Sequence, residues 1–331
     1  MSAIVARNLK PVDSLEVSVL VDNVVDPLST LPKGVTGEAA VLRSKGLMVS
    51  SGHARCCANH GLSLVITARI GSDIRILLFD AGPEAYTISR NGDRLRTPFG
   101  EVGSIFLSHG HWDHAGAMLR ALQLIRDRNG GREVPYFAHP DMFRTRATRL
   151  AKDSLRLMED VPSIEALSAH GARVVNTTEP QRLLDGMAYV SGEIPRVTPF
   201  ERGLKGQHRK ALDGTGWELD ELIMDERFLA VNVAGKGVVV LTACSHAGVI
   251  NVLKHAKSCF EDARLHAVVG GLHLSGSNEQ IIPETVTALR EFDLAVIAAG
   301  HCTGWRAMTA LVNAFGDSTL VPLAVGKRIT F

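Results

Sequence analysis

Three histidines and an aspartate lie within six residues in the segment HGHWDHAG, residues 109–116. His109 and His111 are two positions apart, so both project to the same side if the chain is extended there. Asp113 and His114 follow, and they could bind a second metal beside one held by the first pair. Imidazole and carboxylate suit zinc, manganese or iron. Because a buried cluster without metal would leave polar groups unpaired, we interpret the segment as a metal site.

Four residues are too few for two catalytic metals, since each needs about three protein ligands and a position for water. Further candidates follow apolar runs, where small neighbours would leave space for a metal or a substrate. We expect His246 and His301 to complete the set, with Cys244 and Glu193 as additional candidates. The alternative for Cys244 is a small buried residue beneath the site. Asp80, which ends the run ILLFD, is expected to orient a ligand histidine.

Other residues are candidates for contact with substrate or with the reacting groups. We expect Asp113, Glu193 and His273 to act in catalysis, with His273 stabilising charge on the attacked group. His60 lies in a long loop rich in Gly, Ser and Pro and could reach the substrate, or it could simply be exposed. Arg196 could bind an anionic group through its two-pronged guanidinium, or pair with Glu193.

The composition limits the class of protein. The 331 residues are 45% hydrophobic and 21% charged, which allows a sizeable core. We expect a single domain over 1–331, with loop or helical insertions within 24–60 and 141–226. A net charge of +1 without a basic block argues against nucleic acid as a partner. The expected partner is a small molecule, with an anionic one as a candidate, and the oligomeric state is unknown.

The sequence gives no sign of a membrane or secreted protein. It has no run of 18 apolar residues and no signal-peptide pattern at the N-terminus, so we predict no membrane span. Its five cysteines are an odd number with no paired spacing, which favours a reduced, cytoplasmic protein.

The elements that must position these residues can be predicted from apolar patterns. Strands are predicted in the N-terminal half at 15–23, 62–70, 74–80 and 104–108. GSD at 71–73 is typical of a hairpin turn, and 115–128 has the apolar spacing of a helix. Residues 134–140 should form another strand. Residues 141–170 are charged and predicted helical, as a solvated face or as a lid facing an anionic substrate; their basic residues are Arg144, Arg146, Arg149, Lys152 and Arg156.

The second half has a similar order of predicted strands and helices to the first. Strands are predicted at 188–194, 227–246 (with AGKG as a hairpin turn), 265–274 and 294–302, and helices at 247–257, 283–292 and 305–315. Each half gives antiparallel strands and then strands that alternate with helices. This pattern predicts an α+β fold, an αββα sandwich of two mixed β-sheets flanked by helices.

HGHWDHAG, with LLFDAG upstream and AAGHC downstream, resembles the metallo-β-lactamase superfamily. More narrowly, the chain resembles the branch of 7,8-dihydropterin-6-methyl-4-(β-D-ribofuranosyl)-aminobenzene-5′-phosphate synthase. The motifs are NHGLSL at 59–64, SGEIPR at 191–196, LTACSHAGVIN at 241–251, GGLHL at 270–274 and GHCTGW at 300–305. The resemblance implies an αββα sandwich and a site for two metals at the top of its sheets. It implies that the ligands include His109, His111, Asp113, His114 and His301.

The chain departs from the superfamily pattern at two ligand positions. Where a bridging aspartate usually follows a strand-end glycine, this sequence has Ala243 and Cys244. Where a third histidine usually follows such a glycine, it has Gly192 and Glu193. His246 would then be a substitute ligand.

These observations predict a metal-dependent hydrolase that activates water to cleave an ester, lactone or phosphoester. The expected cofactor is one or two zinc ions, with manganese or iron as alternatives. The resemblance to the synthase branch implies an alternative, a synthase or transferase that joins a phosphoribosyl-type donor to a pterin or aromatic amine precursor. A third alternative is a metal-bound sensor without catalysis. The fold does not choose among them.

Overall fold

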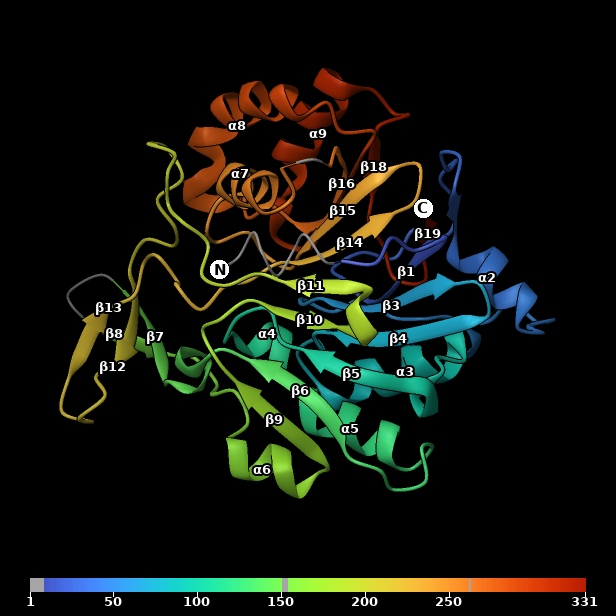
Figure 1. The fold of residues 1–331 in the computed structure, drawn as a ribbon, viewed down its shortest axis with the longest axis horizontal. Helices are drawn as coiled ribbons and strands as arrows, with labels where there is room; N and C mark the ends of the chain where they lie inside the picture. The colour runs from blue at the N-terminus through green and yellow to red at the C-terminus, as the bar shows by residue number, and fades with distance from the viewer. Residues whose placement is uncertain (1–8, 151–153, 262) are drawn as a thin grey trace.

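The computed structural model describes residues 9–150, 154–261 and 263–331. Two β-sheets face each other, helices cover their outer faces, and a small third sheet lies to one side, at the left in Figure 1. The αββα sandwich predicted from the sequence is therefore the observed architecture. None of the helices in the described part of the chain has the length and apolar character needed to cross a membrane.

The first sheet has eight strands in the order β2-β19-β1-β3-β4-β5-β6-β9. They span Ser14–Val21 (β1), Val35–Thr36 (β2), Ser63–Ile70 (β3), Asp73–Phe79 (β4), Val102–Phe106 (β5), Val134–Ala138 (β6), Ala172–Asn176 (β9) and Arg328–Thr330 (β19). β1, β3 and β4 are antiparallel, and the strands from β4 to β9 are parallel. The four strands predicted in the N-terminal half and the turn between β3 and β4 are confirmed. The helices of this half are α2 (Glu38–Ser44), α3 (Ala85–Leu95), α4 (Trp112–Ala115), α5 (Met118–Arg126) and α6 (Ile164–Ala169).

The second sheet has seven strands in the order β10-β11-β14-β15-β16-β17-β18. They span Gln181–Leu183 (β10), Ala188–Val190 (β11), Leu229–Val233 (β14), Gly237–Thr242 (β15), Leu265–Gly271 (β16), Val296–Gly300 (β17) and Leu320–Pro322 (β18). β14 and β15 form the predicted hairpin, and β15 to β18 are parallel. The helices of this half are α7 (Val249–Cys259), α8 (Ile282–Leu289) and α9 (Trp305–Phe315).

Burial on both faces explains the apolar run of β15. Val239 and Leu241 pack in the core between the two sheets, whereas Val238 and Val240 pack in the core beneath the helices. Successive side chains of a strand point to opposite faces, so a strand covered on both sides needs apolar residues throughout. This packing holds the ends of the central strands in fixed positions.

The helix predicted over 141–170 is wrong for most of that stretch. β7 (Arg146–Arg149) and β8 (Leu155–Leu157) are paired antiparallel, and among the described residues of this stretch only α6 is α-helical. β12 (Gln207–Lys210) and β13 (Trp217–Leu219) complete a four-stranded sheet in the order β13-β12-β7-β8. The pairing of β7 with β12 joins segments far apart in sequence, so tertiary contacts override local propensity. Lys152 lies outside the described residues.

Candidate metal centre

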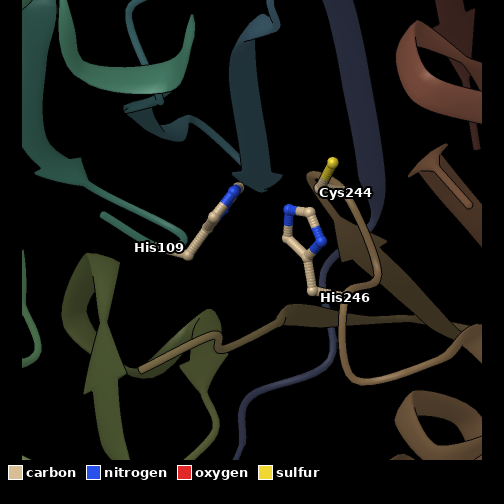
Figure 2. Close-up of side chains that lie close together, drawn as sticks. All are labelled: His109, Cys244 and His246. Carbon is tan, nitrogen blue, oxygen red and sulfur yellow. The ribbon is translucent and has the colours of Figure 1, made fainter. Parts of the chain in front are cut away.

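The candidate ligands lie just beyond the carboxyl ends of parallel strands in the two sheets. His109 follows β5 by three residues, His246 follows β15, and His301 follows β17 directly. Parallel strands that end at one edge bring such residues together although they are distant in sequence. Figure 2 shows the side chains of His109, Cys244 and His246 pointing into the same space from the two sheets. The sequence-predicted residues of both halves therefore meet at one place.

Three groups of side chains have ligand atoms close enough to share a metal. Within each group the ligand atoms lie within 4.8 Å of one another. The groups are His109, Cys244 and His246; His114, Cys244 and His301; and Cys244, His273 and Cys302. Cys244 is the residue that all three groups share. Its sulfur also lies 2.9 Å from the sulfur of Cys302, and both thiols are free and buried.

Asp80, expected to orient a ligand histidine, contacts His114. Its Oδ2 lies 2.7 Å from Nδ1 of His114, and both side chains are fully buried. Asp80 also accepts hydrogen bonds of 2.8 Å from the backbone N–H and from the hydroxyl of Ser108. Burial lowers the pKa of His114, but the charges of Asp113 and Asp80 outweigh it and raise that pKa to about 9. The other ring nitrogen, Nε2, is left facing the cluster.

His246 is held through its backbone while its ring is left unpaired. The carboxylate of Glu226 accepts hydrogen bonds from the backbone N–H groups of His246 (2.8 Å) and Ala247 (2.6 Å). Burial and the neighbouring His273 lower the pKa of the His246 ring well below its usual value, so the ring is neutral. The ring centroid of His246 lies 4.8 Å from those of His109 and His111.

Unpaired imidazole nitrogens show that the site fits a metal. Nε2 of His114, both ring nitrogens of His246 and Nε2 of His301 are buried without a hydrogen-bond partner among the described residues. Leaving a buried polar group unpaired costs about 1–3 kcal/mol, so native proteins rarely do it. Here the unpaired atoms lie beside one cysteine, and a metal ion would satisfy them together.

Asp113 is a carboxylate surrounded by imidazoles. Its Oδ2 lies 3.4 Å from Nε2 of His301, 3.5 Å from Nε2 of His60 and 3.7 Å from Nε2 of His114. Burial alone would raise the pKa of Asp113, but the charges of His114 and His301 lower it well below its usual range. Asp113 is therefore ionised at neutral pH.

His109 and His111 contact each other at the other side of the cluster. Nε2 of His109 lies 3.0 Å from Nδ1 of His111, and Nδ1 of His109 lies 2.9 Å from the hydroxyl of Ser108. Gln207 donates its side-chain amide to Nε2 of His111 at 2.9 Å. Burial lowers the pKa of His111 to about 3, so its ring is neutral and able to act as a ligand.

Four residues at the strand ends have left-handed backbone conformations. Their φ values are +56° for Asp80, +58° for Ser245, +43° for His273 and +48° for His301. Non-glycine residues adopt this region at a cost, and such strain tends to gather at functional sites. Its concentration around the unpaired histidines supports a function for this edge.

Two known proteins are similar to this chain in sequence over most of its length. No protein-family model matches the chain. The chain is 28% identical over 277 residues to 7,8-dihydropterin-6-methyl-4-(β-D-ribofuranosyl)-aminobenzene-5′-phosphate synthase of Methanocaldococcus jannaschii, covering 83% of this chain and 90% of that protein. It is also 28% identical over 267 residues to an uncharacterized protein of the same organism, covering 81% of this chain and 93% of the relative.

Two solved structures are similar over nearly their whole length. Tm1679, a metal-dependent hydrolase of the β-lactamase superfamily, gives a TM-score of 0.67 at 18% identity and covers 96% of this chain and 98% of that one. Unliganded yeast PDE1 gives a TM-score of 0.53 at 11% identity, and the match covers 97% of this chain and 100% of that one. This chain has the metallo-β-lactamase fold. The fold implied by the resemblance is thereby confirmed, and the 28% identity to the synthase agrees with the resemblance to its branch.

In this metallo-β-lactamase fold, a cavity of about 480 Å³ opens over the candidate ligands. His60 and His273 line it together with Asp113, so both lie where the sequence analysis expected substrate or reacting groups. His60 is 57% exposed in its side chain, and Nδ1 of His273 lies 3.4 Å from the sulfur of Cys244. The cavity is large enough for a small organic molecule.

Two predicted residues are not brought to the cavity. Glu193 places Oε1 3.2 Å from Nε2 of His139, and its side chain is 45% exposed. Arg196 donates hydrogen bonds to the backbone carbonyls of Ile194, Leu222 and Ile223. Neither residue is among those that line the cavity in the described part of the chain. The guanidinium of Arg196 thus holds the backbone together instead of facing a substrate.

Sequence reasoning did not single out several residues that shape the site. Asn23 places Oδ1 3.1 Å from Nδ1 of His301, and Glu226 fixes the backbone at His246. Cys302 was not singled out either, and its sulfur belongs to one of the ligand groups. The position of Asn23 at the end of the run LEVSVLVDN was a usable signal, because polar residues at strand ends gather at this edge.

Proposed function

We propose that the protein is a metal-dependent hydrolase that acts on a small molecule in the cavity above the cluster. The observation that carries this proposal is the set of buried, unpaired nitrogens of His114, His246 and His301 beside Cys244. The neighbour Tm1679, described as a metal-dependent hydrolase, supports the same reaction class. The substrate types that suit such a site are an ester, a lactone or a phosphoester.

The residues divide into two ligand sets that share one thiolate. His109 and His246, with His111 beside them, would hold one metal together with Cys244. The second set of ligands is Asp113, His114, Cys244 and His301. Imidazole with thiolate is the donor set of zinc, so we propose zinc as the cofactor, and iron or manganese as alternatives that a thiolate favours less.

The chain's own groups can then be given roles. When bound, a divalent metal supplies a Lewis acid and lowers the pKa of a water molecule that it holds. Asp113, ionised and at the cavity wall, would accept a hydrogen bond from the attacking water and orient it. Burial lowers the pKa of His273, but contact with Cys302 outweighs it and raises that pKa, so His273 can donate a hydrogen bond to charge that develops on the attacked group.

A synthase is the second candidate. It is favoured by the 28% identity to a named synthase over 83% of this chain. A synthase of the expected kind would join two organic molecules, whereas a hydrolase consumes one organic substrate and water. The two candidates therefore predict different products from the same site.

Metal content and product analysis test the proposal. We expect the purified protein to hold zinc, iron or manganese by elemental analysis, and His246→Asn to lose most of it. His170→Asn is the matched control, because Nδ1 of His170 contacts the carbonyl of Ala166 on α6, away from the cavity. When an ester, lactone or phosphoester is hydrolysed in oxygen-labelled water, the labelled oxygen should appear in the product. A protein that binds no metal even after reconstitution would overturn the proposal.

A further inference from the structure

The edge strand of the four-stranded sheet contributes an arginine to the cavity. Arg156 lies in β8, opposite Thr148 of β7, and its side chain is exposed. It lines the same cavity as His111, Asp113 and His246 although these residues come from the two large sheets. The small sheet therefore brings a permanent positive charge to the opening above the candidate metal ligands.

Carboxylates engage Arg146 and Arg209 of this sheet and Arg144 just before β7, whereas none engages Arg156 among the described residues. Arg146 pairs with two buried aspartates, Arg144 contacts Glu218 at 2.6 Å, and Arg209 contacts the same carboxylate at 2.7 Å. Within 9–150, 154–261 and 263–331, no hydrogen bond or ion pair is formed by the guanidinium of Arg156. Its side chain is free to bind a ligand.

No carboxylate among the described residues that line the cavity is left unpaired for Arg156. Among the described residues that line it, the one carboxylate is Asp113, and three imidazoles already surround that group. Trp112, Met158 and Leu204 add apolar surface to the lining of the cavity. A ligand that suits this lining combines an apolar part with an anionic group.

We propose that Arg156 binds an anionic group, a carboxylate or a phosphate, at the end of the substrate remote from the metal centre. The guanidinium presents parallel N–H donors that match either group. This inference rests on the proposed function, because the opposite end of the substrate is taken to lie at the metal ligands. It makes Arg156 a residue that determines specificity, with no part in the chemical step.

Dicarboxylates of graded length test the inference on the metal-loaded protein. Succinate, glutarate and adipate carry two carboxylates, while butyrate, valerate and caproate have the same chain lengths with one. Calorimetric titration should give tighter binding of at least one dicarboxylate than of its partner, by roughly 10-fold or more, as expected for a charge-assisted hydrogen bond. Arg156→Gln should reduce that ratio to about 1.

Arg173→Gln is the matched control. Arg173 is also an exposed arginine on an edge strand, β9, but it does not line the cavity. Its variant should keep the wild-type ratio. A wild-type protein that binds each pair equally, or binds neither member, would overturn the role of Arg156, as would an unchanged ratio in Arg156→Gln. Metal content is measured on the same samples, so a failure of the proposed metal centre can be distinguished from a failure of the role of Arg156.

Discussion

Cys244 is the side chain at which the three ligand groups meet, and it stands where the superfamily pattern usually has an aspartate. Burial, followed by contact with Cys302, raises the pKa of the Cys244 thiol well above its usual value. A thiol in such a place ionises only when a cation compensates the charge. The residue therefore makes sense as a ligand, whereas a thiol of this kind without metal would be inert.

The first prediction concerns this sulfur. Cys244→Ser keeps the size of the side chain but removes the thiolate, so zinc affinity should fall by at least roughly 10-fold, the lower range for disturbing a metal site. Competition with a chromogenic chelator measures the affinity, and circular dichroism checks the fold. Cys57→Ser is the control, because Cys57 contacts Asn91 outside the ligand groups. Unchanged zinc affinity in Cys244→Ser would contradict a ligand role.

The second prediction concerns Asp113. Asp113→Asn keeps the shape of the side chain but removes its charge, so the attacking water loses its acceptor. Side chains that act on the proton or the orientation of a reacting water typically contribute about 10²–10⁴-fold, so kcat should fall by at least roughly 10²-fold. Steady-state kinetics with metal content measured in parallel provide the test. Near wild-type kcat in metal-loaded Asp113→Asn would mean that this carboxylate takes no part in the reaction.

At the scale of elements, the sequence predicted what local patterns determine. The central strands were predictable because they are apolar on both faces, and His109 to His114 were found because they lie together in sequence. The four-stranded sheet was not predictable, because its strands are short and its central pairing, β7 with β12, joins segments about sixty residues apart. The contact of Glu193 with His139 could not be predicted for a related reason, since the two residues come from different parts of the chain.

The third prediction concerns the anchor of the four-stranded sheet. Arg146 is buried on β7, contacts Asp225 at 2.7 Å and Asp220 at 3.2 Å, and donates to the carbonyl of Gly110 at 2.7 Å. Removing one partner of a buried ion pair leaves the other charges buried and unpaired, which typically costs about 3–5 kcal/mol. Arg146→Ala should therefore lower the free energy of unfolding by about that amount in urea titrations.

Arg173→Ala is the control for this experiment, because exposed substitutions away from such networks usually change stability by about 0.5 kcal/mol or less. The loss in Arg146→Ala should come with weaker metal binding, since Gly110 lies between His109 and His111. A loss of stability below about 1 kcal/mol in Arg146→Ala would show that the two aspartates are satisfied without the arginine.

At the scale of the whole molecule, the candidate metal centre joins the two halves of the sandwich. His109, Asp113 and His114 follow a strand of the first sheet, whereas His246 and His301 follow strands of the second. Burial of apolar side chains between the sheets stabilises their packing, and this contribution does not depend on a metal. At the strand ends the two halves present unpaired nitrogens to each other, and a shared ion would connect them.

The fourth prediction follows from this connection. A metal that binds only the folded protein stabilises it by RT ln(1 + [L]/Kd), which is about 2.7 kcal/mol when the free metal is at 100 times Kd. Chelation should thus lower Tm by roughly 5–10 °C, because about 1 kcal/mol corresponds to roughly 2–4 °C in a chain of this order of size. Adding zinc back should restore Tm. His246→Asn should lose this response, whereas His170→Asn should keep it, and differential scanning calorimetry measures both. If the chelated wild-type protein melted at the same temperature as the zinc-loaded one, the halves would be held by the apolar core alone, and the ion would have no share in their stability.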